Sequence, residues 1–339
     1  MKLQSQWTYC YKKGLRGAKV SKDHYLDGDK LFFVLQYGDF PWTSLILQLD
    51  LNTQECKTVY EEKHIVGRLG ICDNDRFFFT SMRARVFCVA KDGTLVWETV
   101  LQKGNPSTEI TMDGDRIFVS HHGVYSLDKN TGEILWFNDD YDQKTRCNLL
   151  NLEKGIVCGA SGELFCLDKN SGESIWEVGE EFGINQCIQL ENGHLLADHS
   201  HESFIIVDPN EGKLIKTIPS KGYLYGEPVL QDGKLYIGDG NDVMDSTSGH
   251  MSCYEVSGDD LKEVFSHPTS GAVSTSAVIS GDRLFFATED SYLYCIDKNT
   301  GEDLMAKKKT KVICRDIFVR ENELIVLSDI GQVEVFAIV

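Results

Sequence analysis

The chain has 339 residues, with 52 acidic and 34 basic side chains and a formal net charge of −18. Its hydrophobic share of 42% and charged share of 25% are those of a folded globular protein, which excludes disordered, collagen-like and fibrous classes. Surfaces that bind nucleic acid or anionic membranes need clustered Lys and Arg. The charge therefore argues against both of these partners and permits a basic protein partner.

The first residues lack the continuous apolar core of a signal peptide, and no stretch approaches the ~18 apolar residues of a membrane helix. The eleven cysteines include no C-x-x-C or adjacent pair. We therefore expect a cytoplasmic protein with reduced thiols rather than a disulfide or metal framework. Cys88, Cys166 and Cys295 lie in apolar runs, where a thiol packs as a small hydrophobe.

Polar turns followed by apolar runs recur along the chain. Asp-Gly and Asn-Gly pairs supply the positive φ that tight hairpins need. The flanking runs are rich in Phe, Tyr, Ile, Leu and Val, and they predict strands of roughly five to seven residues. Eight such turn-and-strand segments occur, at 27–33, 73–78, 113–118, 153–157, 191–196, 232–236, 281–285 and 321–325.

A second motif follows each of these segments except the last. Four copies align without gaps, at 125–136, 165–176, 205–216 and 294–305. Weaker copies lie at 47–53, where Gln54 replaces the glycine, at 87–97 and at 253–260. Asp and Asn can bond back to the chain, and the glycine can take a left-handed conformation, so each copy predicts a hairpin turn. The aligned turn residues are Asp128, Asp168, Asp208 and Asp297, with Gly132, Gly172, Gly212 and Gly301.

Four strands in every ~40 residues, repeated along the chain, predict an all-β fold, the eight-bladed β-propeller with four-stranded blades. We expect a single domain over 1–339. The last unit has three strands, so an N-terminal strand at 6–13 is expected to complete the last blade with 312–339 and close the ring. A ring of seven blades, one of them irregular, is the alternative.

The pattern Leu-x-Leu-Asp-x-x-Thr-Gly-x-x-x-Trp resembles the repeat of quinoprotein dehydrogenases and of the scaffold lipoprotein in outer-membrane barrel assembly, the pyrroloquinoline quinone (PQQ)-like propeller superfamily. The resemblance covers about residues 6–339. In that family the tryptophan packs on the neighbouring blade, which implies a structural role for Trp97, Trp136 and Trp176, with Trp7 as a fourth. Lys216 and Met305 replace the tryptophan elsewhere.

Family dehydrogenases are longer and exported, and many carry an adjacent Cys-Cys pair over the cofactor. This chain lacks that pair and a cluster that maps to a calcium site. The resemblance therefore implies the non-catalytic branch, with no cofactor and no enzyme activity.

Two patterns could hold a metal, but each has a simpler interpretation. The segment from Asp128 to Gly132 has its glycine at the fifth position, whereas a calcium loop needs it at the sixth, so a turn is favoured. The pair His121-His122 and the pair His199 and His201 follow second strands, where polar contacts to a partner are favoured over a shared metal site.

Loops after second strands and between blades should emerge at one face of the propeller. They mix carboxylates, which steer a basic partner, with aromatic rings, which anchor it. The lysines at 307–311 run against this trend and are expected to form a solvated turn. The candidate partner-binding residues are Phe40, Trp42, His121, His122, Asp139, Asp140, Tyr141, Asp142, Glu180, Glu181, Phe182, His199, His201, Tyr223, Tyr225, Asp239, Asp242 and Asp245.

These observations favour a monomeric, non-catalytic, cytoplasmic protein-binding propeller. One specific hypothesis is an immunity or inhibitor protein that caps a basic toxin or enzyme through the acidic and aromatic face. The alternative is an enzyme that uses the central pocket for a small ligand such as a quinone.

Overall fold

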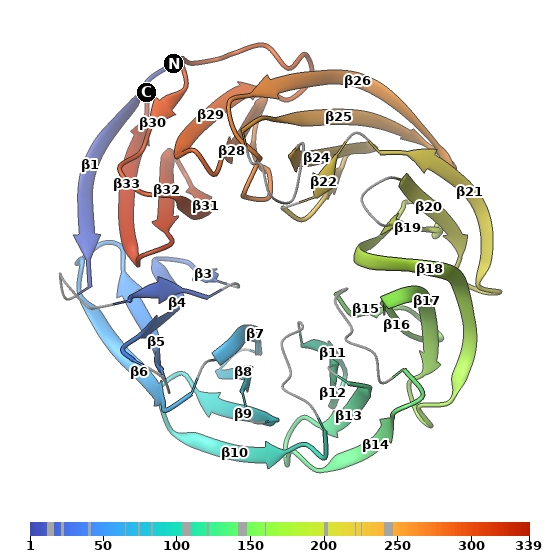
Figure 1. Cartoon of the computed structure of the whole chain (residues 1–339). Coiled ribbons are helices and arrows are strands. Elements are labelled where there is room, and N and C mark those ends of the chain that lie inside the picture. Colours follow the sequence, from blue (N-terminus) through green and yellow to red (C-terminus); the bar gives the residue numbers. More distant parts are fainter. Residues whose placement is uncertain are drawn as a thin grey trace. The chain divides into compact units, whose positions relative to one another are not determined.

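The computed structural model describes residues 1–11, 17–21, 24–39, 42–64, 66–73, 75–82, 84–103, 110–120, 122–141, 148–159, 161–199, 203–220, 222–224, 226–240 and 247–339. For 67–72, 161–162, 180–185, 199 and 223 it describes the backbone alone. Every regular element in these ranges is a strand, and the antiparallel strands form eight four-stranded blades (Figure 1). In blades 1 and 6 the innermost of the four positions is divided between two short strands. The predicted eight-bladed β-propeller is confirmed, and the seven-bladed alternative is wrong.

The chain divides into two compact units, one of residues 14–187 and 207–215 and the other of 1–13, 188–206 and 216–339. The single domain expected over 1–339 stays a prediction. The first unit holds blades 1 to 4. Blade 1 consists of β2 (Lys19–Val20), β3 (Tyr25–Asp27), β4 (Lys30–Tyr37), β5 (Thr43–Asp50) and β6 (Cys56–Glu62). Blade 2 consists of β7 (Val66–Asp73), β8 (Arg76–Ser81), β9 (Arg85–Ala90) and β10 (Leu95–Val100), and blade 3 of β11 (Thr111–Asp113), β12 (Arg116–Ser120), β13 (Val124–Asp128) and β14 (Ile134–Asn138). Blade 4 consists of β15 (Leu150–Asn151), β16 (Gly155–Gly159), β17 (Ser161–Asp168) and the start of β18 (Ser174–Gln189).

Blade 5 begins with the end of β18, so blades 4 and 5 share one strand in a seven-stranded sheet. The second unit holds most of blade 5 and all of blades 6 to 8. Blade 5 continues with β19 (Leu195–His199), β20 (Ser203–Asp208) and β21 (Lys213–Pro219). Blade 6 consists of β22 (Tyr223–Leu224), β23 (Val229–Gln231), β24 (Lys234–Gly240), β25 (Gly249–Ser257) and β26 (Asp260–Thr269), and blade 7 of β27 (Val278–Ser280), β28 (Arg283–Ala287), β29 (Tyr292–Asp297) and β30 (Lys308–Lys309). Blade 8 consists of β31 (Cys314–Arg320), β32 (Glu323–Ser328), β33 (Gln332–Ile338) and β1 (Leu3–Cys10).

The signature turns form as their residue types predict. One carboxylate oxygen of Asp128 accepts the backbone N–H groups of Asn130 and Thr131, each at 2.8 Å. Gly132 closes the turn with a φ of 74° and donates its N–H to the Asp128 carbonyl. Because the aspartate oxygen is occupied by its own loop, this segment is a hairpin turn, as expected. Asp168, Asp208 and Asp297 accept the same kind of bond, and Gly172, Gly212 and Gly301 have the same positive φ.

A tryptophan on the outer strand docks blades 2, 3 and 4 onto the next signature turn. The ring of Trp136 lies against Gly172, where an added Cβ would come within 2.6 Å of the indole. The Trp136 Nε1–H donates to the carbonyl oxygen of Lys169 at 2.9 Å. The same two contacts recur from Trp97 to Gly132 and Lys129 and from Trp176 to Gly212 and Pro209, so all three rings pack on a neighbouring blade.

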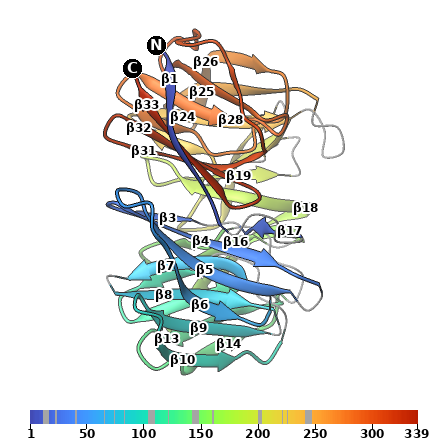
Figure 2. The ribbon, with the colours of Figure 1, turned by 90° about the vertical axis from the view of Figure 1, so that its left-hand side faces the viewer.

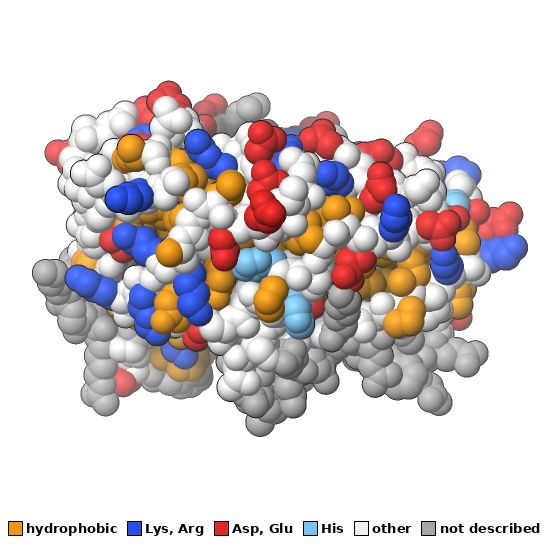
Figure 3. All heavy atoms as spheres, turned by 90° about the horizontal axis from the view of Figure 1, so that it is seen from above, with side chains coloured by type: hydrophobic (Ala, Val, Ile, Leu, Met, Phe, Trp, Pro, Cys, Tyr) orange, Lys and Arg blue, Asp and Glu red, His pale blue; other side chains and the backbone are white. Residues whose placement is uncertain are grey.

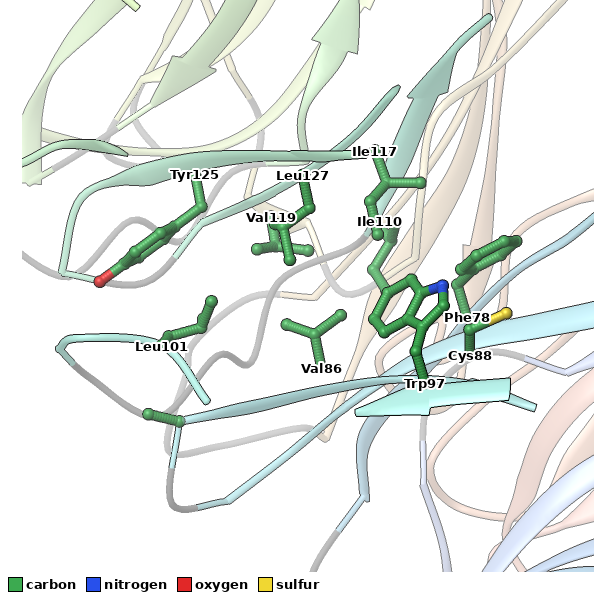
Figure 4. Close-up of a cluster of buried hydrophobic side chains, with 11 residues drawn as sticks. Phe78, Val86, Cys88, Trp97, Leu101, Ile110, Ile117, Val119, Tyr125 and Leu127 are labelled. Atoms are coloured by element: carbon green, nitrogen blue, oxygen red, sulfur yellow. The ribbon is translucent and has the colours of Figure 1, made fainter. Parts of the chain in front are cut away.

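The core between blades 2 and 3 shows the effect of this docking. Trp97 lies beside Phe78 and Cys88 of its own blade and faces Ile110 and Ile117, which lead into and lie on blade 3 (Figure 4). An indole in such a place removes roughly 150–250 Å² of apolar surface from water. The aromatic ring therefore fills the space between two separate sheets.

Phe265 takes the tryptophan position in blade 6. Its ring lies against Gly301, where an added Cβ would come within 2.7 Å. Two residues further on, His267 contacts the Gly301 carbonyl at 3.0 Å through Nδ1. Asn138 donates to the Gly172 carbonyl in the same place after Trp136. The docking residues are thus more varied than the tryptophan signature indicates.

The lysine after the signature aspartate reaches back to the preceding blade. Lys129 Nζ is 3.2 Å from Asp73 Oδ2, and Lys169 Nζ is 3.0 Å from Asp113 Oδ2. The hydrogen bond from each lysine holds the pKa of its aspartate below the usual value. Lys91 with Asp27 and Lys298 with Asp232 repeat the arrangement. The ammonium groups of these lysines are therefore paired with carboxylates inside the protein.

The N-terminal strand completes blade 8. Strand β1 pairs antiparallel with β33, and the backbones of Lys2 and Val339 exchange two hydrogen bonds (Figure 2). The strand covers Leu3–Cys10 rather than the expected 6–13. Trp7 follows a register shift in β1, as Trp97 does in β10, and it is half-buried.

The replacement Gln54→Gly is expected to stabilise the protein. Gln54 is exposed and has a φ of 62°, the conformation that glycine adopts at this position in the other turns. Relief of this conformation should raise the free energy of unfolding by about 1 kcal/mol. Urea unfolding measures the change, and Gln54→Ala, which keeps the Cβ, is the matched control. Equal stability of the two variants would contradict the explanation.

Gly172→Ala is expected to destabilise the protein by about 2 kcal/mol more than Gly114→Ala. Both glycines have positive φ, so both variants carry the same backbone strain. Only the Cβ at position 172 meets the indole of Trp136, whereas nothing lies within 4 Å of a Cβ at position 114. Unfolding curves of the two variants isolate the docking contact, and similar losses would show that the indole can move aside.

Candidate protein-binding surface

Loops after second strands and between blades lie at the same end of each antiparallel sheet, which is where the candidate residues were expected. Seven of them lie outside the described residues: Phe40, His121, Asp142, His201, Tyr225, Asp242 and Asp245. For Glu180, Glu181, Phe182, His199 and Tyr223 the structure describes the backbone alone. The described side chains among the candidates are Trp42, His122, Asp139, Asp140, Tyr141 and Asp239.

The connection between blades 4 and 5 differs from the expectation. Glu180, Glu181 and Phe182 lie within the long strand β18 rather than in a loop. The reason is that β17 also extends, so that Gly162 pairs with Phe182 and holds this backbone in the sheet. Tyr223 likewise lies in a short strand and pairs with Gly240.

The connection between blades 3 and 4 places two carboxylates on the surface. Asp139 is exposed and forms an ion pair with Lys103 at 3.0 Å, which lowers its pKa. Asp140 is also exposed, and its backbone N–H donates to Asn138 Oδ1 at 3.0 Å. Since Lys103 neutralises Asp139, Asp140 is the carboxylate of this loop that is better placed to meet a basic partner.

Tyr141 is a core residue rather than a surface anchor. It is only 8% exposed, and its ring stacks on Phe165 with the centroids 3.7 Å apart. Its hydroxyl contacts Ser174 Oγ at 2.9 Å and donates to Glu177 at 3.2 Å. Burial raises the pKa of this hydroxyl. Its expected role as a partner-binding ring is wrong, because the ring fills a space on blade 4.

Asp239 is also buried, with 4% of its surface exposed. Its carboxylate accepts the backbone N–H of His250 at 2.8 Å and lies 3.3 Å from His250 Nδ1. It therefore joins the ends of β24 and β25 across their connection. The expectation that this carboxylate faces a partner is wrong, since it is used within blade 6.

The candidate aromatic anchor Trp42 is 38% exposed, directly before β5. In blade 2 the residue after the second strand is Met82, which is exposed to the same extent. His122 is half-buried and has a φ of 50° in the turn between β12 and β13. The described part of this end of the first unit thus combines exposed apolar groups with the Asp140 carboxylate.

The candidate set omits a regular series of exposed aliphatic residues on outer strands. Each stands directly before a docking position, and in blades 2, 3 and 4 that position is a bulge at which the strand register shifts. A search for the residue that precedes each tryptophan position would have found them. They are Val96, Leu135, Ile175, Ile215 and Val264, between 39% and 46% exposed.

The described cysteines are free thiols, and most of them lie in the core. Cys88, Cys166 and Cys295 are buried in strands, as expected, and burial raises the pKa of Cys166 to about 12. Across the described ranges, no three His, Cys, Asp or Glu side chains gather as they would around a metal ion. A search of the same residues finds no helix with the length and apolar character that a membrane span requires.

Comparisons with known proteins agree with the repeat. Residues 42–179 match the family model of the outer membrane protein assembly factor BamB. No curated protein matches the sequence. The fold is similar to that of BamB from Moraxella catarrhalis, with a TM-score of 0.69 and 14% identity over 99% of this chain and 100% of that one.

Two further solved structures have the same fold. Sqt1 from Saccharomyces cerevisiae gives a TM-score of 0.75 at 11% identity over 99% of both chains. A europium-containing methanol dehydrogenase gives 0.70 at 13% identity, over 99% of this chain and 93% of that one. At such identities the likeness concerns the fold. The repeat, the blades and the family model over residues 42–179 together support a PQQ-like β-propeller.

Proposed function

We propose that this chain is a non-catalytic propeller that binds a basic protein through the loops at the end of the sheets where the second strands terminate. The net charge of −18 is the observation that carries the proposal. Excess carboxylates accelerate the encounter with a basic partner, and apolar groups such as Trp42 and Met82 can then be buried against it. The matching family model is that of an assembly factor, which favours a role in binding other proteins over catalysis.

The finer proposal is an immunity or inhibitor protein that acts in the cytoplasm as a monomer and covers the active face of a basic toxin or enzyme. Such inhibitors work by occlusion, so they need a rigid scaffold and a complementary surface rather than reacting groups. Support comes from the docked blades, which supply a packed scaffold, and from the charge. The signature aspartates are unsuited to this task because their oxygens bind their own turns.

Charge reversal at the two ends of the sheets tests which end binds. Asp140→Lys is expected to weaken capture of a basic partner about tenfold in low salt, because a steering carboxylate becomes repulsive. Glu211→Lys is the matched control, since Glu211 is exposed in the signature turn of blade 5, at the opposite end. Titration calorimetry across a salt series measures both variants. Equal losses, or binding that ignores ionic strength, would remove the basis of the proposal.

Thermal unfolding with pyrroloquinoline quinone and calcium separates binding from catalysis. The proposed function predicts no shift of the midpoint, because no redox group is used. A shift of several degrees would instead support the quinone-dependent enzyme.

Inhibition is tested separately. The chain is added to any toxin that is encoded beside its gene, and the toxin's activity should fall in proportion to the complex formed.

A further inference from the structure

The outer edge of blade 7 carries a run of lysines, at 307–309 and 311. The outer strand β30 is only two residues long, Lys308–Lys309, and it pairs with Leu293 and Tyr292 of β29. The Thr310 N–H still donates to the Ser291 carbonyl at 2.8 Å, and the chain then bends at Lys311 and Val312. Strand β30 is the last strand of its sheet, so one backbone edge is not paired within it.

Every second residue of this segment points into the protein. Lys308 lies over the ring of Phe336, with Nζ 4.8 Å from the ring centroid. The Thr310 hydroxyl donates to the carbonyls of Ser291 at 3.0 Å and Val312 at 2.8 Å. These contacts determine which side chains face outward. The exposed ones are Lys307, Lys309, Lys311 and Ile313, which we call the lysine edge.

No carboxylate among the described residues neutralises the charges of the lysine edge. Lys307 and Lys309 share the ring of Tyr292, with Nζ atoms 4.4 and 4.5 Å from its centroid. Their hydrogen bonds go to uncharged acceptors, Ser270 Oγ at 3.0 Å and the Asp290 carbonyl at 3.1 Å. Within the described part of the chain, none of the three exposed lysines forms an ion pair. Two ammonium groups are thus held near one another on one ring, where an anion would be favourable.

An apolar pair ends the lysine edge. Ile313 is 42% exposed and Ile330 is 47% exposed. The Asp329 N–H donates to the Ile313 carbonyl at 3.0 Å, which brings the two isoleucines into neighbouring positions. Figure 3 shows one face of the molecule, where Lys and Arg side chains gather toward the left and Asp and Glu are spread over the remainder. A basic region is unusual on a chain with a net charge of −18, and it favours an anionic ligand that the remaining surface would not attract.

We propose that the lysine edge binds an extended acidic segment of a partner protein, with a carboxylate at every second residue and an apolar residue at the end that meets Ile313 and Ile330. Side chains on one face of a strand repeat every ~6.6–6.8 Å, so such a segment sets two of its carboxylates opposite Lys307 and Lys309, and a further one can meet Lys311 beyond them. The unpaired backbone edge can add the segment as a further strand. Nucleic acids and anionic membranes are disfavoured as ligands, because their negative charge would extend beyond the three lysines and meet the negatively charged remainder of the surface. This surface is separate from the loops proposed to bind a basic protein, and it does not depend on them.

The test measures fluorescence anisotropy of a short synthetic peptide in which Glu alternates with Thr and Leu stands at one end. The wild-type chain should bind this peptide more tightly than a peptide of the same composition with its Glu residues contiguous. Replacement of all three exposed lysines by Gln should weaken binding about tenfold, because three exposed ion pairs of modest strength are lost together. Lys311→Glu should weaken it as well, and Lys311 can change without loss of a hydrogen bond to the described residues. Circular dichroism confirms that each variant is folded.

Lys262→Glu is the matched control, since Lys262 is exposed on β26, the outer strand of the neighbouring blade. Unchanged binding by this variant supports a local site. The proposal is overturned by an equal loss in Lys262→Glu, by equal affinity for the two peptides, or by no binding. Tighter binding of oligodeoxythymidine or of phosphatidylserine vesicles would overturn the protein partner. Self-association of the Gln variant without peptide binding by the wild type would show instead that the lysines only protect a strand edge.

Discussion

The contact between an aromatic ring and a glycine turn is the interaction on which the remaining structure depends. A blade whose inner strands are apolar on both faces cannot bury those faces alone. In the first unit, Trp136 covers Gly172 and donates to the Lys169 carbonyl, and Lys169 itself reaches back to Asp113. Shape, a hydrogen bond and an ion pair thus connect blade 3 to blade 4. Glycine is required here for two reasons, since φ is positive and the indole occupies the space of a Cβ.

This construction decides which residues remain for function. The aspartates that suggest calcium ligands bind their own turns, and the lysines beside them are paired across blades. Carboxylates and rings elsewhere are also used internally, as Asp239 and Tyr141 are. What varies between blades is the length of the connections and the exposed side of the outer strands. A binding function is therefore expected in these places, where substitution does not disturb the docking of the sheets.

The distribution of charge makes two kinds of contact compatible in one chain. Carboxylates are in excess overall, which favours a basic partner through long-range attraction. The lysine edge is a short local exception, whose effect is confined by screening to about one Debye length, ~8–10 Å in physiological salt. An acidic segment of matching length therefore meets attraction at close range, while a long polyanion meets repulsion from the remaining surface.

The sequence by itself determined the blades, the turns and the docking tryptophans, because each depends on local chemistry that repeats every ~40 residues. An Asp-x-Asn-x-Gly turn needs no distant partner, and even Gln54 adopts the glycine conformation when the turn requires it. Only the tertiary structure decided that Tyr141 and Asp239 are buried, that β18 runs on from blade 4 to blade 5, and that Phe265 serves as a docking ring. It also decided that Lys307, Lys309 and Lys311 face outward together. These outcomes depend on the shapes and hydrogen-bond partners that other strands and neighbouring blades supply, and a pattern read along one segment does not contain them.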